Sequence, residues 1–134
     1  MLNIDLNPYS SVYMGRPAMV ELRPFFKGSL TGEAVQAFAI KERFERFAAL
    51  WRKTRGLSSS PDRLTRNPNY EQIIQLGHPV IPFVLAELKQ RPDFWFRALR
   101  ELTGTDPVPA MHRGDLDAMT EDWIAWAESK DVGF

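Results

Sequence analysis

Helix-breaking residues divide the chain into a first part that cannot be helical and a longer part that can. Five of them fall within the first thirty residues: Pro8, Gly15, Pro17, Pro24 and Gly28. Proline removes a backbone donor and clashes with the preceding turn, so no helix of ordinary length fits before about Thr31. The sequence therefore predicts an extended N-terminal arm, residues 1–30, followed by a helical domain, residues 31–134.

The arm carries the pattern of two short strands. Leu2, Ile4 and Leu6 alternate with polar residues, the next segment "NPYSS" is typical of a turn, and residues 18–23 supply a second alternating stretch. This pattern predicts a small β-hairpin. Because an isolated hairpin is marginally stable in water, we expect the arm to lie on the helical body or on a partner.

Five helices are expected after the arm, which makes the predicted fold all-α. The longest spans residues 32–55 and ends before Gly56. Its large side chains recur at i, i+4, i+7 and i+11 and form one stripe: Ile40, Phe44, Phe47 and Trp51.

The other four helices follow from capping signals. Asn67 with Pro68 is a favourable helix start, Asp93 and Asp115 are further candidate N-caps, and residues 57–66 have the composition of a polar connection. The predicted helices cover residues 67–77, 80–90, 93–104 and the segment from Asp115 onward.

The middle of the chain reads "YEQIIQLGHPVIPFVLAELKQRPDFWFRALRELTG", residues 70–104. A helix ending in Leu-Gly, a turn flanked by prolines, the "IPFVLAEL" helix and the "RALRELTG" helix together resemble one and a half short HEAT-like repeats. The chain as a whole is similar to small uncharacterised bacterial proteins. The resemblance implies a helical hairpin at this place and brings no activity with it.

Composition narrows the function classes. The chain has no cysteine, which excludes disulfides and thiolate metal sites, and no apolar run approaches the roughly 20 residues that cross a bilayer. The N-terminus also lacks the features of a signal peptide. We therefore expect a soluble, cytoplasmic protein without a membrane partner.

Charge is unevenly distributed, although the net charge is zero. Residues 41–66 hold eight Lys and Arg against three Asp and Glu, whereas residues 67–134 hold six against eleven. Nucleic-acid binding through the basic segment is one alternative function, because clustered cations contact phosphates. Its candidate residues are Lys41, Arg52, Lys53, Arg55, Arg63 and Arg66.

Catalytic motifs do not emerge from the sequence. His78 lies in a helix corner, and His112 is followed by Asp115 and Asp117, which have capping and first-turn roles of their own. An unrecognised enzyme centred on His112 is the second alternative. We expect no enzymatic activity, no cofactor and no metal.

Aromatic residues are the main positive signal. Trp95 shares a helical stripe with Leu99 and Leu102, so Phe94 and Phe96 cannot both join that stripe. Exposed aromatics are enriched at protein interfaces. The candidate contact residues are Phe94, Phe96, Trp126 and Phe134.

These signals favour a non-catalytic protein-interaction module, such as a prokaryotic regulatory or accessory subunit. The acidic second half suits a basic partner, and antitoxin-like masking of a basic toxin or nuclease is one version. Self-association into a homo-oligomer remains open.

Overall fold

The computed structural model describes residues 32–134. The predicted N-terminal arm and its β-hairpin lie outside these described residues. Within residues 32–134 the regular structure consists of six α-helices and two short 3-10 helices, without a strand, which confirms the all-α prediction for this part of the chain. Contacts divide the chain into two units, Met1–Gln36 and Ala37–Phe134, and the packing described below belongs to the second.

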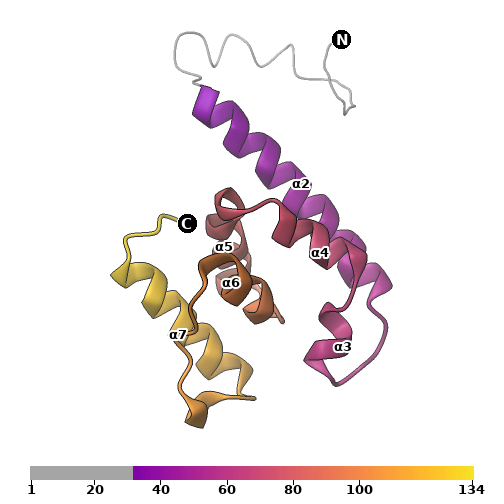
Figure 1. The fold of residues 1–134 in the computed structure, drawn as a ribbon, viewed down its shortest axis with the longest axis vertical. Helices are drawn as coiled ribbons and strands as arrows, with labels where there is room; N and C mark the ends of the chain where they lie inside the picture. The colour runs from indigo at the N-terminus through magenta and orange to yellow at the C-terminus, as the bar shows by residue number, and fades with distance from the viewer. Residues whose placement is uncertain (1–31) are drawn as a thin grey trace. The chain divides into compact units, whose positions relative to one another are not determined.

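Helix α2, Gly32–Thr54, is the long helix that the apolar stripe predicts (Figure 1). Phe44, Ala48 and Trp51 are buried, and Ile40 and Phe47 pack partly against the core. The helix ends where Gly56 adopts a left-handed conformation, φ 78°, which a residue without a side chain tolerates best.

The polar connection after α2 contains a helix that is not among the five predicted helices. Helix α3, Pro61–Thr65, begins after Ser60, whose hydroxyl accepts a hydrogen bond from the Arg63 N–H. A serine N-cap followed by proline at the first helical position is a recognised start signal. The Trp51 Nε1–H donates to the Leu64 carbonyl over 2.7 Å and so ties α3 to α2.

The next two helices begin close to the expected positions. In α4, Pro68–Gln75, the predicted cap Asn67 accepts a hydrogen bond from the Asn69 N–H at 2.8 Å. A 3-10 turn, His78–Val80, then leads into α5, Ile81–Gln90. The inward side chains of α5 are fully covered: Val84, Leu85 and Leu88.

Helix α6, Phe96–Thr103, has Trp95 at its N-cap position, two residues after the predicted cap Asp93. Asp93 does not cap it: the carboxylate accepts a hydrogen bond from the adjacent Phe94 N–H and is otherwise engaged by arginines of α2. Phe94 therefore precedes the helix, so its direction does not follow the helical stripe. The predicted stop is confirmed, since Gly104 is left-handed with φ 72°.

The last helix, α7, Leu116–Ser129, starts at the predicted cap, because the Asp115 carboxylate accepts a hydrogen bond from the Ala118 N–H at 3.1 Å. A 3-10 turn, Ala110–His112, precedes it. Along this helix Trp123 is fully buried, while three other apolar side chains are partly buried: Leu116, Met119 and Trp126.

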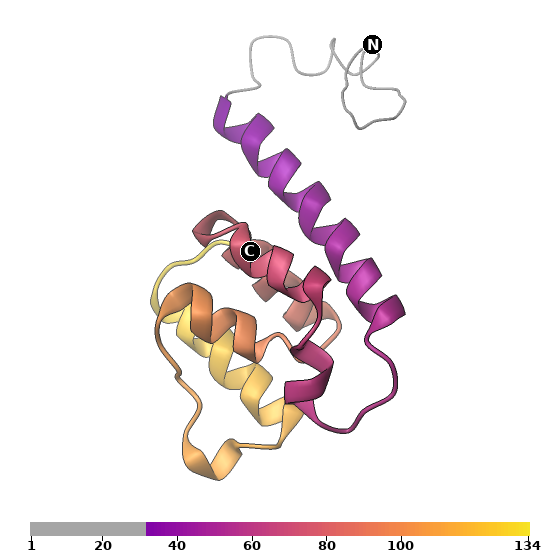
Figure 2. The same ribbon diagram turned by 45° about the vertical axis from the view of Figure 1, so that its right-hand side comes forward.

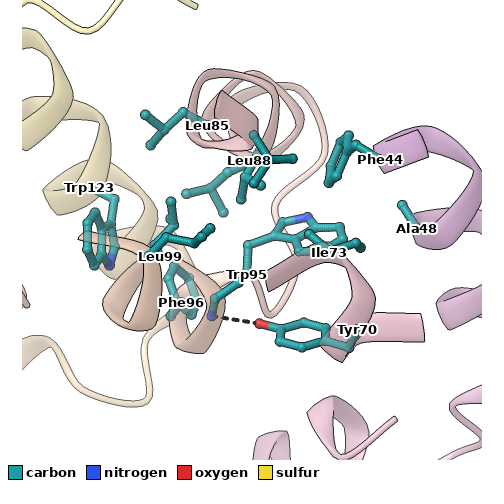
Figure 3. Packing of buried hydrophobic residues seen from close by; sticks show 14 of the residues in the cluster. Phe44, Ala48, Tyr70, Ile73, Leu85, Leu88, Trp95, Phe96, Leu99 and Trp123 are labelled. Carbon is teal, nitrogen blue, oxygen red and sulfur yellow. Dashed lines mark hydrogen bonds between the residues drawn. The ribbon is translucent and has the colours of Figure 1, made fainter. Parts of the chain in front are cut away.

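The core lies where α5 packs against α6 and α7, and where α4 packs against α6 (Figure 2). Helix α2 joins this core through its large aromatic side chains. The ring of Phe44 lies 5.4 Å from that of Trp95, and Trp51 lies 4.7 Å from the same ring. Figure 3 shows Trp95 at the centre of this cluster, with Phe44, Ile73 and Tyr70 around it.

Candidate interaction surfaces

Two arginines of the basic segment point into the molecule instead of toward solvent. Arg52 donates to Glu87 at 2.8 Å and to Asp93 at 3.3 Å, and Arg55 donates to Asp93 at 2.8 Å. Their guanidinium groups also lie over indole rings, Arg52 over Trp95 at 5.6 Å and Arg55 over Trp51 at 4.5 Å. Both cations are therefore committed to internal carboxylates and rings.

The other cations of the candidate nucleic-acid set remain at the surface. Their side chains are exposed and form no ion pair within the described residues: Lys41, Lys53, Arg63 and Arg66. The excess positive charge that the sequence assigns to residues 41–66 is thus partly neutralised by acids of α5 and of the segment before α6. A cation that is already paired adds little to phosphate binding.

The four candidate aromatic contacts occupy different environments. Phe96 is only 5% exposed and belongs to the core, so it offers almost no surface to a partner. The expectation that one of the two phenylalanines turns away applies to Phe94, which is half-buried because it precedes α6. Trp126 is half-buried with its ring edge-on to Trp123 at 5.4 Å, and Phe134 is 40% exposed beneath Lys89.

Phe94 lies at a hollow of about 440 Å³ between α3, α6 and the start of α7. Leu116 and Met119 also line this hollow, and so do three arginines: Arg97, Arg100 and Arg113.

Two of the arginines at the hollow are already engaged. Arg97 is held by Glu71, Glu101 and the Thr65 carbonyl; burial alone would lower its pKa, but the two carboxylates raise it above its usual value. Arg113 donates to Asp106 at 2.7 Å. Within residues 32–134, Arg100 has no carboxylate partner among the ion pairs.

Tyr70 connects α4 to the start of α6. Its hydroxyl donates to the Phe94 carbonyl at 2.9 Å and accepts from the Ala98 N–H at 3.0 Å. Burial raises the pKa of Tyr70 well above its usual range, although the Ala98 hydrogen bond lowers it in part. The hydroxyl thus satisfies backbone groups at the segment where α6 begins, and it has a structural role.

The acids that follow His112 in sequence do not surround it in the structure. Its Nδ1 lies 2.7 Å from the Asp122 carboxylate on α7, while Asp115 caps that helix. No group of three or more potential metal ligands occurs in the part of the chain that the structure describes. His112 and Asp122 link the turn before α7 to the helix.

Helix α7 presents an acidic face away from the core. Asp117, Glu121 and Glu128 fall within an arc of about 40°, since four and eleven residues correspond to nearly whole turns of a helix. All three are exposed and have no ion-pair partner within residues 32–134. Ile124 lies beside them and is half-buried. We refer to Asp117, Glu121, Ile124 and Glu128 as the α7 face.

Several exposed apolar side chains are not among the predicted contact residues. Phe38 is 61% exposed and Leu50 is 39% exposed, both on α2, and Met111 is 83% exposed on the turn before α7. Phe38 does not fall on the helical stripe that contains Phe44. The spacing of the two residues in the sequence therefore predicts that Phe38 lies outside the core.

The described residues form a small helical protein, with exposed acidic side chains on α7 and exposed apolar side chains on α2. Comparisons of the chain with models of protein families, with curated proteins and with solved structures find no match. The resemblance of residues 70–104 to HEAT-like repeats therefore stays a prediction. Among the described helices, none combines the length and the apolar character that a membrane span requires.

Proposed function

We propose that the protein is a non-catalytic interaction module whose α7 face binds a basic segment of another protein. The observation that carries this proposal is that Asp117, Glu121 and Glu128 lie on one exposed face of the helix. None of the three forms an ion pair within the described residues. Like charges along one face repel each other, and a basic partner relieves that repulsion.

The surroundings of the α7 face suit a protein partner. Ile124 adds a small apolar contact beside the carboxylates, and complementary charge around such a contact raises the rate and specificity of association. A toxin or nuclease whose basic surface is masked by this module is one version of the proposal, and a regulatory or accessory subunit is the more general one.

Affinity capture from an extract of the source cell tests the proposal. The tagged wild type is compared with the variant Asp117→Asn, Glu121→Gln, Glu128→Gln. A matched control removes three other exposed acids: Glu33→Gln, Glu45→Gln and Asp62→Asn. We expect a protein with a basic surface to bind the wild type and the control but to be lost from the α7 variant.

Equal capture by all three proteins, or capture of nothing, would contradict the proposal. Recovery should also fall as salt rises, since the contact is electrostatic and lies at the surface. A captured protein that is acidic, or whose recovery does not depend on salt, would likewise count against a basic partner.

Nucleic-acid binding is the second candidate function, because four cations of the basic segment remain exposed: Lys41, Lys53, Arg63 and Arg66. Arg52 and Arg55 are unsuitable test positions because their loss would disturb the core. The informative variant is Lys53→Ala, Arg63→Ala, Arg66→Ala, tested by fluorescence anisotropy on labelled duplex DNA and single-stranded RNA. Binding that is present at low salt and lost in this variant would favour this function over the first; absence of binding at low salt would eliminate it.

A further inference from the structure

The outer face of α2 carries large apolar groups and unpaired charges side by side. Phe38 and Leu50 are exposed, and the alanines Ala39 and Ala49 next to them are exposed as well. In Figure 2 the other described helices all lie on one side of α2. Phe44 faces the core from the opposite side of the same helix.

The charges on this face are arranged symmetrically about Phe44. Residues 42–46 read "ERFER", so that Glu42 and Arg46 have opposite signs at equal distances from Phe44. At 100° per residue, Glu42 and Arg46 lie about 20° to either side of the direction opposite Phe44. Neither forms an ion pair within residues 32–134.

Residue size follows the same symmetry. Phe38 and Ala49 lie on one flank of the face, and Ala39 and Leu50 lie on the other, each flank about 40 to 60° from its centre. Each flank thus holds one large and one small side chain, one of which precedes Phe44 along the helix while the other follows it. A surface of this kind is complementary to itself after a two-fold rotation.

We propose that a second copy of this chain docks antiparallel on the outer face of α2, with the two-fold axis at the level of Phe44. Glu42 then lies opposite Arg46 of the partner subunit. Phe38 packs on the partner subunit's Ala49, and Leu50 packs on the partner subunit's Ala39. Alanine lets the large side chain approach the helix, and the two charge pairs fix the register.

A second copy explains features that another partner would not require. An isologous interface uses one patch on both subunits, so every contact occurs twice and the patch must be complementary to itself. A patch shaped for a different protein has no reason to show opposite charges and opposite sizes at equal distances from one residue. The proposal does not rest on the α7 face, which lies on another helix.

The dimer is expected to be weak. The patch extends about 18 Å along the helix, and one helix pair buries less area than the interfaces of stable dimers, so we expect a dissociation constant on the order of 10 to 100 μM.

Analytical ultracentrifugation from about 5 to 500 μM, a range that brackets the expected constant, provides the first test. Wild type should change from monomer to dimer over this range. Glu42→Arg alone and Arg46→Glu alone each place like charges opposite one another, and we expect each to weaken the dimer at least tenfold. The double variant restores opposite signs, so it should recover the dimer. Circular dichroism checks that every variant keeps its helical content.

The orientation has its own test, because the chain contains no cysteine. A mixture of an Ala39→Cys chain and a Leu50→Cys chain should form a mixed disulfide, since these positions meet across the two-fold axis. An Ala39→Cys chain alone should not crosslink, because its two copies lie about 15 Å apart along the axis.

Three results would overturn the proposal. They are a protein that stays monomeric at every concentration, single charge reversals that leave the dimer unchanged, and self-crosslinking of the Ala39→Cys chain. The last result would indicate a parallel arrangement, in which the charge symmetry has no role.

Discussion

The inner and outer faces of α2 differ in whether their charged side chains form ion pairs. On the inner face, Arg52 and Arg55 bind Glu87 and Asp93 and lie over indole rings. On the outer face, Glu42 and Arg46 have no ion-pair partner within residues 32–134. The charge count of a basic segment therefore does not show which of its cations are available, since position on the helix decides which of them are paired.

The largest effect is expected at the aromatic centre of the inner face. Trp95→Ala removes a fully buried ring that contacts Phe44, Trp51 and Tyr70, and we expect it to cost about 3–5 kcal/mol, enough to unfold a marginally stable domain. Urea unfolding measures the loss. Phe38→Ala, on the outer face, is the control and should change stability by about 0.5 kcal/mol or less at low protein concentration.

The ion-pair network of the inner face should give the second effect. Asp93→Asn leaves two partly buried arginines without one of their carboxylates, and we expect a loss of about 2 kcal/mol in the free energy of unfolding. Glu42→Gln is the matched change on the outer face and should be nearly neutral. Equal losses at both positions would remove the distinction between the two faces.

Tyr70→Phe tests the hydroxyl that connects α4 to α6. Its loss leaves the Phe94 carbonyl and the Ala98 N–H without their partner, and we expect a cost of about 1–2 kcal/mol. The pH dependence adds a second readout. Because the pKa of Tyr70 is raised in the folded state, the unfolded state loses the proton first, and stability falls as pH rises above about 10.

Unfolding midpoints of wild type and Tyr70→Phe between neutral pH and this alkaline range measure that effect. The fall should be shallower in the variant. Parallel curves would show that other groups cause the alkaline loss.

The smallest effect is expected at a surface pair. Burial alone would raise the pKa of Asp106, but hydrogen bonds from Arg113 and from the Val108 N–H lower it below the usual value. The lowered pKa means that Asp106 stabilises the fold at neutral pH and loses this contribution as pH falls below about 4. Asp106→Asn should cost less than about 1 kcal/mol at pH 7, with a smaller difference in acid. A difference that grows in acid would contradict this assignment.

Most of the helical pattern could be predicted because its signals are local. The caps Asn67 and Asp115 and the stop glycines Gly56 and Gly104 all function as expected. The same rules also predict a start for α3, at Ser60 followed by Pro61, within the segment whose composition is that of a polar connection.

The start of α6 shows where local rules fail. Asp93 is a good N-cap by residue type, yet its carboxylate binds Arg52, which is 41 residues away, and Arg55. Helix α6 starts at Phe96 instead, and Phe94 lies outside the helical pattern. Helical periodicity therefore could not predict the half-burial of Phe94.

Local sequence signals suffice to predict the all-helical character of residues 32–134 and most of the helix ends, because capping, proline and glycine effects and apolar periodicity act within one or two turns. Which charges are paired and which apolar side chains remain exposed depends on how the helices pack. The reason is that an ion pair depends on distance in space, and residues separated by about 40 positions in sequence meet only after the helices have packed.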